Sequence, residues 1–183
     1  MKVLVVIDMQ NDFITGPLGT PEARAIVPSV QKKVDEAIKN GNMVVYTRDT
    51  HQENYLETME GKKLPVKHCI EDTVGWEIAD DVLPTGYVEN VYFVNKPTFG
   101  DYCLPGLLSA FADSNCGLNY GDEIELIGVC TDICVISNAL LLKAHFYSDI
   151  EISVDATCCA GVTPETHEAA LKTMEMCQIN VKR

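Results

Sequence analysis

The chain has 183 residues, of which 46% are hydrophobic and 22% charged, a composition typical of a soluble globular protein, and we expect a single domain over residues 1–183. No apolar run approaches the ~20 residues that span a bilayer, so no membrane partner is expected. The formal charge of −13 and the scattered Lys and Arg residues argue against nucleic acid and favour a small-molecule or protein partner.

Short apolar runs rich in β-branched residues alternate with segments of helical spacing. In chain order we expect strand 3–7, helix 27–40, strands 43–47 and 91–94, helix 105–112, strand 123–127, helix 134–147, strand 150–154, helix 164–177 and strand 179–181. This order predicts an α/β fold, a doubly wound, mostly parallel β-sheet flanked by helices on both faces, or α/β/α sandwich. The long polar stretch 48–81 is typical of a functional or disordered loop.

The cysteines and the N-terminal segment indicate the compartment. The first apolar run is too short for an export signal and lacks a small-residue cleavage site, so we expect reduced thiols and a cytoplasmic location. Six of the cysteines are expected to be inert core thiols. They are Cys69, Cys103, Cys116, Cys158, Cys159 and Cys177.

The residues that end the expected strands are polar. In an open α/β sheet, ligands bind beyond the carboxyl ends of the strands, so these residues are the candidates for a site. Asp8 ends the first strand, Asp49 and His51 follow the second, Lys96 ends the third, and the segment 130–134 follows the fourth. Together they offer an acid, a base, metal ligands and a thiol.

Cys134 lies at a strand-to-helix turn, where backbone N–H groups and the helix dipole favour a thiolate nucleophile. The N–H groups of Cys130 and Cys134 are candidates for an oxyanion hole on the same turn. A nucleophilic cysteine needs a proton acceptor or a positive charge beside it, and the strand ends supply Asp8 and Lys96 for this role.

Five segments of the chain carry a family resemblance in the same order. They are VIDMQNDF at 6–13, DTH at 49–51, LPVKHC at 64–69, KPTFG at 96–100 and GVCTDICV at 128–135. With these motifs the chain resembles the isochorismatase-like cysteine hydrolases, and within them the nicotinamidase (pyrazinamidase) type, over essentially its whole length.

The resemblance implies a catalytic triad of Asp8, Lys96 and Cys134 that forms a thioester acyl-enzyme, releases ammonia and is then hydrolysed to the acid. It also implies a cis peptide bond between Val129 and Cys130, before the nucleophile. The expected reaction is the hydrolysis of nicotinamide to nicotinate and ammonia. The alternative is another amidase of the superfamily that acts on a ureido, carbamoyl or other small amide without a metal, so metal content separates the two.

Asp49 and His51 are two residues apart, so an extended strand end points both side chains to the same face, where they suit one metal. His68 is the third candidate ligand, and Glu60 or Glu57 the fourth, with Glu60 the least secure assignment. This ligand set fits a divalent metal, and we expect zinc. The ligand types alone suit iron and manganese equally well. In nicotinamidases the metal binds the pyridine nitrogen, so here it would orient the substrate.

Four aromatic residues lie near these motifs and are expected to wall a pocket for a flat ring: Phe13, Trp76, Phe99 and Tyr102. Isochorismatase chemistry proper is disfavoured, because cleavage of a vinyl ether does not need the thiol of Cys134. A member of the fold without activity, acting as a binding module, is disfavoured because every expected catalytic residue type is present. Related enzymes often assemble, so the resemblance also implies a homo-oligomer.

Overall fold

The computed structural model describes residues 1–86, 88–113, 118–146 and 149–183, and within them six parallel strands form one sheet in the order β3-β2-β1-β4-β5-β6. The strands are β1 (Lys2–Ile7), β2 (Met43–Asp49), β3 (Val91–Lys96), β4 (Glu123–Val129), β5 (Glu151–Ala160) and β6 (Asn180–Lys182). The helices are α1 (Asn11–Ile14), α2 (Pro21–Lys39), α3 (Met59–Lys63), α4 (Leu104–Asp113), α5 (Ile136–Phe146) and α6 (Pro164–Met176). Three short turns complete the list, η1 (Tyr55–Glu57), η2 (Asp80–Val82) and η3 (Thr131–Val135).

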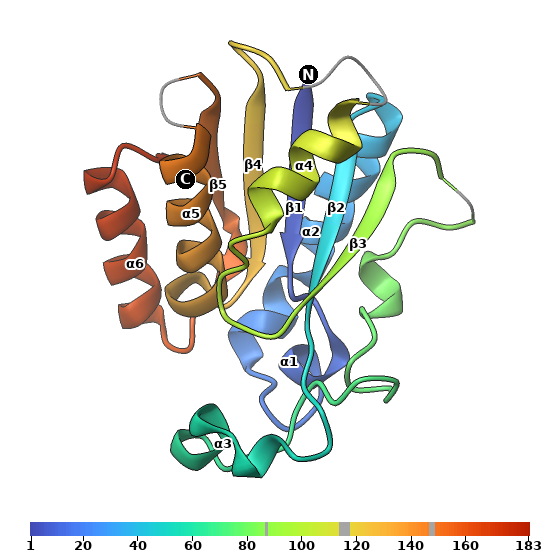
Figure 1. Ribbon diagram of the computed structural model, residues 1–183, viewed down its shortest axis with the longest axis vertical. Helices are drawn as coiled ribbons and strands as arrows, with labels where there is room; N and C mark the ends of the chain where they lie inside the picture. Colours follow the sequence, from blue (N-terminus) through green and yellow to red (C-terminus); the bar gives the residue numbers. More distant parts are fainter. Residues whose placement is uncertain (87, 114–117, 147–148) are drawn as a thin grey trace.

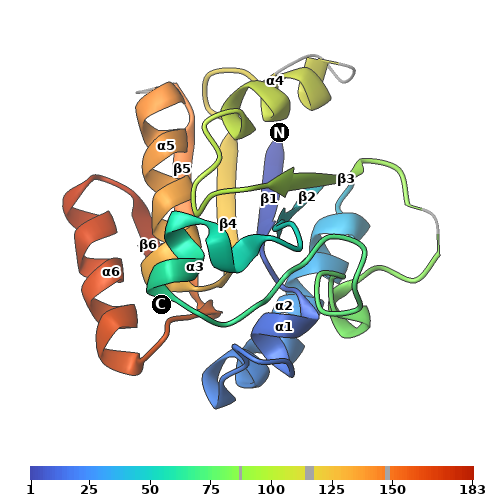
Figure 2. The same cartoon turned by 60° about the horizontal axis from the view of Figure 1, so that its bottom comes forward.

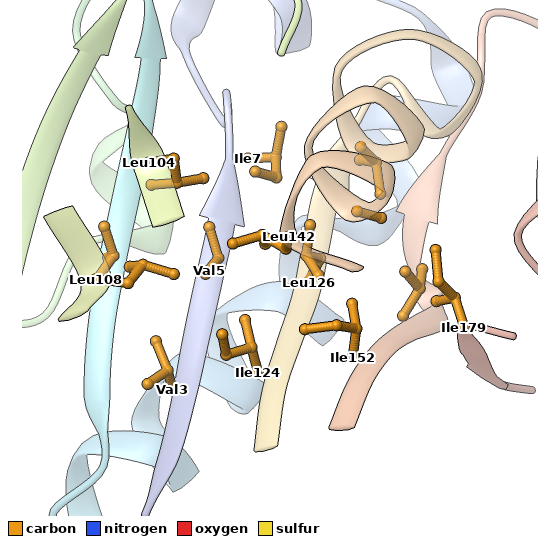
Figure 3. Packing of buried hydrophobic residues seen from close by; sticks show 14 of the residues in the cluster. Val3, Val5, Ile7, Leu104, Leu108, Ile124, Leu126, Leu142, Ile152 and Ile179 are labelled. Carbon is orange, nitrogen blue, oxygen red and sulfur yellow. The ribbon is translucent and has the colours of Figure 1, made fainter. Parts of the chain in front are cut away.

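Helices cover both faces of the sheet, as the sequence predicted (Figure 1). Val3, Val5 and Ile7 of β1 lie in one core cluster with Leu104 and Leu108 of α4 and Leu142 of α5, as Figure 3 shows, while Leu4 and Val6 pack with α2 on the other face. Alternate residues of a strand point to opposite faces, so a central strand of uniformly apolar residues must be covered on both sides. Each such buried side chain contributes roughly 1.5–3 kcal/mol.

Several element bounds differ from those expected. Helix α2 begins at Pro21 rather than at residue 27, because Thr20 caps it by accepting a hydrogen bond from the Ala23 N–H at 3.0 Å. Strand β5 continues to Ala160, because its second half pairs again with β4 after a register shift. Helix α5 begins at Ile136, after the π-turn η3, and the expected end of this helix at residue 147 lies outside the described residues.

The expectation that six cysteines are buried in the core is confirmed for three of them. Cys69, Cys158 and Cys159 are buried, whereas Cys103 and Cys177 are exposed, which corrects the prediction for these two. Cys103 directly precedes α4 and Cys177 directly follows α6, so both lie at helix ends that face solvent. Cys116 lies outside the described residues. Among the described helices, none is both long and apolar enough to cross a membrane.

The candidate residues lie at or just beyond the carboxyl ends of β1, β2, β3 and β4, and these ends meet at one end of the sheet. The register pairs Asp49 with Lys96 across β2 and β3, and Ile7 with Gly128 across β1 and β4. Figure 1 shows α1 and α3 beyond this end, and Figure 2, with the same end turned forward, shows α3 in front of the strands. The loops of this end therefore enclose the strand ends.

Gly128 brings β4 close to β1 just before the candidate site. Its φ is +116°, and a Cβ atom at this position would overlap the backbone carbonyl of Ile7. Only glycine combines this backbone conformation with so close an approach. Gly128 therefore fixes how near the segment that leads to Cys134 lies to the end of β1.

We predict that Gly128→Ala lowers the free energy of unfolding by about 2–4 kcal/mol, through backbone strain and steric overlap together. Urea denaturation measures the effect. The matched control is Gly106→Ala in the exposed first turn of α4, where an added Cβ meets nothing within 4 Å and should change stability by less than about 1 kcal/mol. Equal stability of the two variants would contradict the prediction.

Candidate active site

Lys96 lies at the centre of a buried charged group. Its Nζ is 2.6 Å from Oδ2 of Asp8 and 3.6 Å from Sγ of Cys134. Lys96 and Asp8 are fully buried, and Cys134 is 5% exposed. The structure therefore brings together the three residues that the sequence nominated as a triad, each from the end of a different strand.

Backbone geometry holds the two partners of Lys96 in place. Asp8 directly follows β1 with φ +48°, and Thr47 of β2 donates its hydroxyl to Oδ1 of Asp8 at 2.7 Å. Cys134 lies in the π-turn η3, in which the N–H groups of Ile133 and Val135 both donate to the carbonyl of Cys130, at 3.0 and 3.1 Å. The peptide bond between residues 129 and 130 is cis, as the family resemblance implied.

The electrostatics of the triad set its resting protonation. Burial raises the pKa of the Cys134 thiol well above its usual range, and the charge of Asp8 adds to this, while Lys96 opposes it. Burial alone would lower the pKa of Lys96, but the charges of Asp8, Cys134 and Asp49 outweigh it, so the pKa of Lys96 is raised. Burial also raises the pKa of Asp8. At neutral pH, Lys96 therefore stays charged and Cys134 stays a thiol until a base removes its proton.

A second cluster adjoins the triad. Asp49, His51 and His68 place ligand atoms within 4.8 Å of one another, and all three residues are buried. Oδ2 of Asp49 is 3.0 Å from Nε2 of His51 and 3.5 Å from Nε2 of His68. Oε1 of Glu60, on α3, is 3.6 Å from Nε2 of His51. The geometry thus favours Glu60 over Glu57, which is exposed, as a fourth ligand.

The donor atoms of this cluster fit a metal ion. Nε2 of His51 and Oε1 of Glu60 are buried without a hydrogen-bond partner among the described residues. Nδ1 of His68 lies 2.8 Å from the carbonyl of Val66, which fixes the proton there and leaves Nε2 free to coordinate. Buried polar atoms are almost always satisfied, so these convergent orphan atoms suit a divalent metal.

Three residues that support the cluster were not singled out from the sequence. Gln10 is fully buried and holds the backbone of Asp49, accepting from its N–H at 2.7 Å and donating to its carbonyl at 2.9 Å. Asp12 accepts from the N–H of Cys69 at 2.8 Å, which fixes the segment after His68. Tyr55 packs against both imidazole rings, with centroid distances of 4.6 and 4.9 Å.

A cavity of about 250 Å³ opens onto both clusters. Two of the four expected aromatic residues, Phe13 and Phe99, line it. Its full lining is Phe13, Leu18, Thr20, Asp49, Glu60, Leu64, His68, Phe99, Cys130, Ile133, Cys134 and Val162. Leu64 and Ile133 lie within the family motifs quoted above, whereas no sequence signal marks Leu18, Thr20 or Val162, which reach the cavity from loops.

The other two expected aromatic residues do not line the cavity, which corrects their assignment. The indole N–H of Trp76 donates to Oγ1 of Thr50 at 2.8 Å, and the guanidinium of Arg48 lies 4.0 Å from its ring centroid, so Trp76 packs against the end of β2. Tyr102 is 82% exposed. It lies just before α4, past the turn that carries Phe99, and so faces solvent.

The chain is similar to known proteins in sequence and in fold. The model of the isochorismatase domain family matches residues 2–182. The nicotinamidase of Saccharomyces cerevisiae is 25% identical over 218 residues, covering 99% of this chain and 99% of the relative. The crystal structure of nicotinamidase PncA from Bacillus subtilis matches with a TM-score of 0.81 at 26% identity, covering 100% of this chain and 99% of that one. Pyrazinamidase of Pyrococcus horikoshii in complex with zinc matches with a TM-score of 0.77 at 26% identity, covering 100% and 98%.

We predict that Glu60→Gln weakens zinc binding at least about tenfold, because the variant removes one anionic ligand from the cluster. Calorimetric titration of the metal-free protein with zinc measures the affinity without reference to activity. The matched control is Glu57→Gln, one turn of chain away and exposed, which should bind zinc as the unsubstituted protein does. The reverse pattern, with Glu57→Gln the weaker binder, would show that the fourth ligand is wrongly assigned.

Proposed function

Because the chain belongs to the isochorismatase family of hydrolases, we propose that it is a metal-assisted cysteine amidohydrolase that converts nicotinamide to nicotinate and ammonia. The observation that carries the proposal is one cavity that joins the thiol of Cys134 to the cluster of Asp49, His51 and His68. The thiol supplies the nucleophile for an amide carbonyl, and the cluster supplies a site for a ring nitrogen.

In the proposed reaction, Cys134 attacks the amide carbon while its proton passes to Asp8. The N–H groups of Cys130 and Cys134 hold the oxyanion, and Lys96 stabilises the negative charge that moves between Asp8 and Cys134. Asp8 then returns the proton to the leaving nitrogen, so ammonia departs and a thioester remains on Cys134. Asp8 takes a proton from a water molecule as that water attacks the thioester, and it returns this proton to the sulfur when the acid leaves, so the carboxylate of Asp8 and the thiol of Cys134 are restored.

Substrate orientation in this proposal comes from the rest of the cavity. When bound by Asp49, His51, His68 and Glu60, a divalent metal such as zinc, iron or manganese would supply a Lewis-acid contact for the pyridine nitrogen. Phe13 and Phe99 lie on the cavity wall and would hold the flat ring between them. Fixing the ring at both ends would bring the carboxamide to Cys134 in a reactive geometry.

The compartment and assembly are part of the same proposal. A free catalytic thiol suits the reducing cytoplasm, where Cys134 would not be lost to a disulfide. Formation of a homo-oligomer, expected from the family resemblance, stays a prediction.

We predict that Cys134→Ala lowers the rate of ammonia release from nicotinamide at least about a thousandfold, because the thiol beside Lys96 that would form the thioester is removed. A coupled assay for ammonia measures the rate, and circular dichroism checks the fold. The control is Cys158→Ala, another buried thiol outside the cavity, which should keep its activity. Ammonia release by the unsubstituted protein from a ureido or carbamoyl compound, with none from nicotinamide, would overturn the assigned substrate.

We also predict that Asp8→Asn moves turnover and thiol reactivity in opposite directions. The negative charge of Asp8 raises the pKa of Cys134, so its removal lowers that pKa and makes alkylation of Cys134 by iodoacetamide faster at pH 7. Turnover falls because the proton acceptor is gone. Mass spectrometry of the Cys134 peptide across a pH series measures the shift, and a midpoint that rises in Asp8→Asn would contradict the sign.

A further inference from the structure

Asn138 is a fully buried polar residue on α5, one helical turn after Cys134. Its side-chain amide donates to the carbonyl of Cys134 at 2.8 Å and to the carbonyl of Phe99 at 3.1 Å. Its amide oxygen accepts from the N–H of Asp101 at 3.0 Å. One side chain therefore joins the nucleophile turn to the loop between β3 and α4.

The loop that Asn138 holds begins at Lys96. Nζ of Lys96 also donates to the carbonyl of Thr98 at 3.2 Å, so the path of the loop and the place of the ammonium are linked. Gly100 lets the loop approach α5 closely, because a Cβ atom there would crowd the side chains of Leu141 and Ser137. The loop and α5 are therefore packed so closely that a small movement of α5 would also move the loop and Lys96.

The partners of Asn138 distinguish it from a polar residue that is merely satisfied. Cys134 and Phe99, whose carbonyls it binds, both place their side chains in the cavity. The amide uses both of its donor hydrogens on these two residues. An apolar side chain could fill the same volume, but it would leave the distance between the thiol and the ring wall unfixed.

We propose that Asn138 is a positioning residue, which sets Cys134 relative to Lys96 and Phe99 through the two carbonyls that it binds. The inference rests on the proposed function only in that Cys134 is the nucleophile. Asn138 itself touches no reacting atom. Its contribution is the alignment of the thiol with the ammonium on one side and with the substrate ring on the other.

Two variants separate the donor bonds from the acceptor bond. Asn138→Asp keeps the shape and still accepts from Asp101, but its carboxylate cannot donate to Cys134 and Phe99. Asn138→Ala removes all three bonds. The matched control is Ser153→Ala, which removes a buried hydrogen bond of 2.7 Å to Glu123 near the opposite end of the sheet.

We expect both Asn138 variants to lose about tenfold to a hundredfold in kcat/KM for nicotinamide, since a misplacement of about 1 Å costs this much. Part of the loss is a lower kcat, because Cys134 is misplaced, and part is a higher KM, because Phe99 no longer holds the substrate ring in place. The pH midpoint for alkylation of Cys134 by iodoacetamide shifts upward, because Sγ moves away from the ammonium of Lys96. Ser153→Ala lowers the melting temperature but leaves kcat, KM and the alkylation profile unchanged.

Folded Asn138→Asp with the wild-type kcat and alkylation profile would overturn the proposal. If Asn138→Ala does not fold, the result for Asn138→Asp alone tests the proposal. If neither variant folds, Asn138 is needed for folding, and the proposal that it is a positioning residue is overturned as well. Alkylation needs no amide substrate. If the unsubstituted protein does not hydrolyse nicotinamide, the proposed function fails while the alkylation profile still tests Asn138.

Discussion

The buried ammonium of Lys96 is the constraint on which the site depends. A charge removed from water costs several kcal/mol unless opposite charges and hydrogen bonds replace the lost hydration. Asp8 at 2.6 Å and Asp49 at 3.7 Å provide this compensation, and each comes from a different strand. The burial of Lys96 therefore depends on the register of β1, β2 and β3, which brings the two carboxylates to its ammonium.

Asp49 couples the triad to the metal cluster. One carboxylate oxygen, Oδ1, faces Lys96, and the other, Oδ2, faces His51 and His68. Gln10 holds both the N–H and the carbonyl of Asp49, so the backbone from which this carboxylate projects is fixed. Asp49 thereby fixes the distance between Lys96, which contacts Cys134, and the two histidines. A substrate that contacts both places, as proposed above, requires that this distance does not vary.

The residues that could be predicted from sequence are those at the strand ends. Asp8, Asp49, Lys96 and Cys134 each follow a short apolar run, and parallel strands bring their carboxyl ends to one edge regardless of the loops between them. The cavity wall depends on the path of long loops, which local pattern does not encode. Trp76 was therefore misplaced, because its packing under Arg48 is a contact between residues distant in sequence. The same limit applies to Leu18, Thr20 and Val162 and to Asn138, which follow no chemical motif.

The distribution of polar atoms around the cavity bears on the proposed choice between a ring amide and a carbamoyl substrate. Its polar atoms gather at two places, the thiol of Cys134 and the cluster around Asp49, while most of the wall between them is apolar. The orphan atoms of His51 and Glu60 are lone-pair donors, so a cation satisfies them and a substrate lone pair does not. In the proposed function a divalent metal would take this place, and a planar ring with a lone pair on one atom and a carboxamide on another would contact the metal and the thiol together. The unpaired atoms of the cluster thus support the metal, and only through the metal do they support the proposed ring amide.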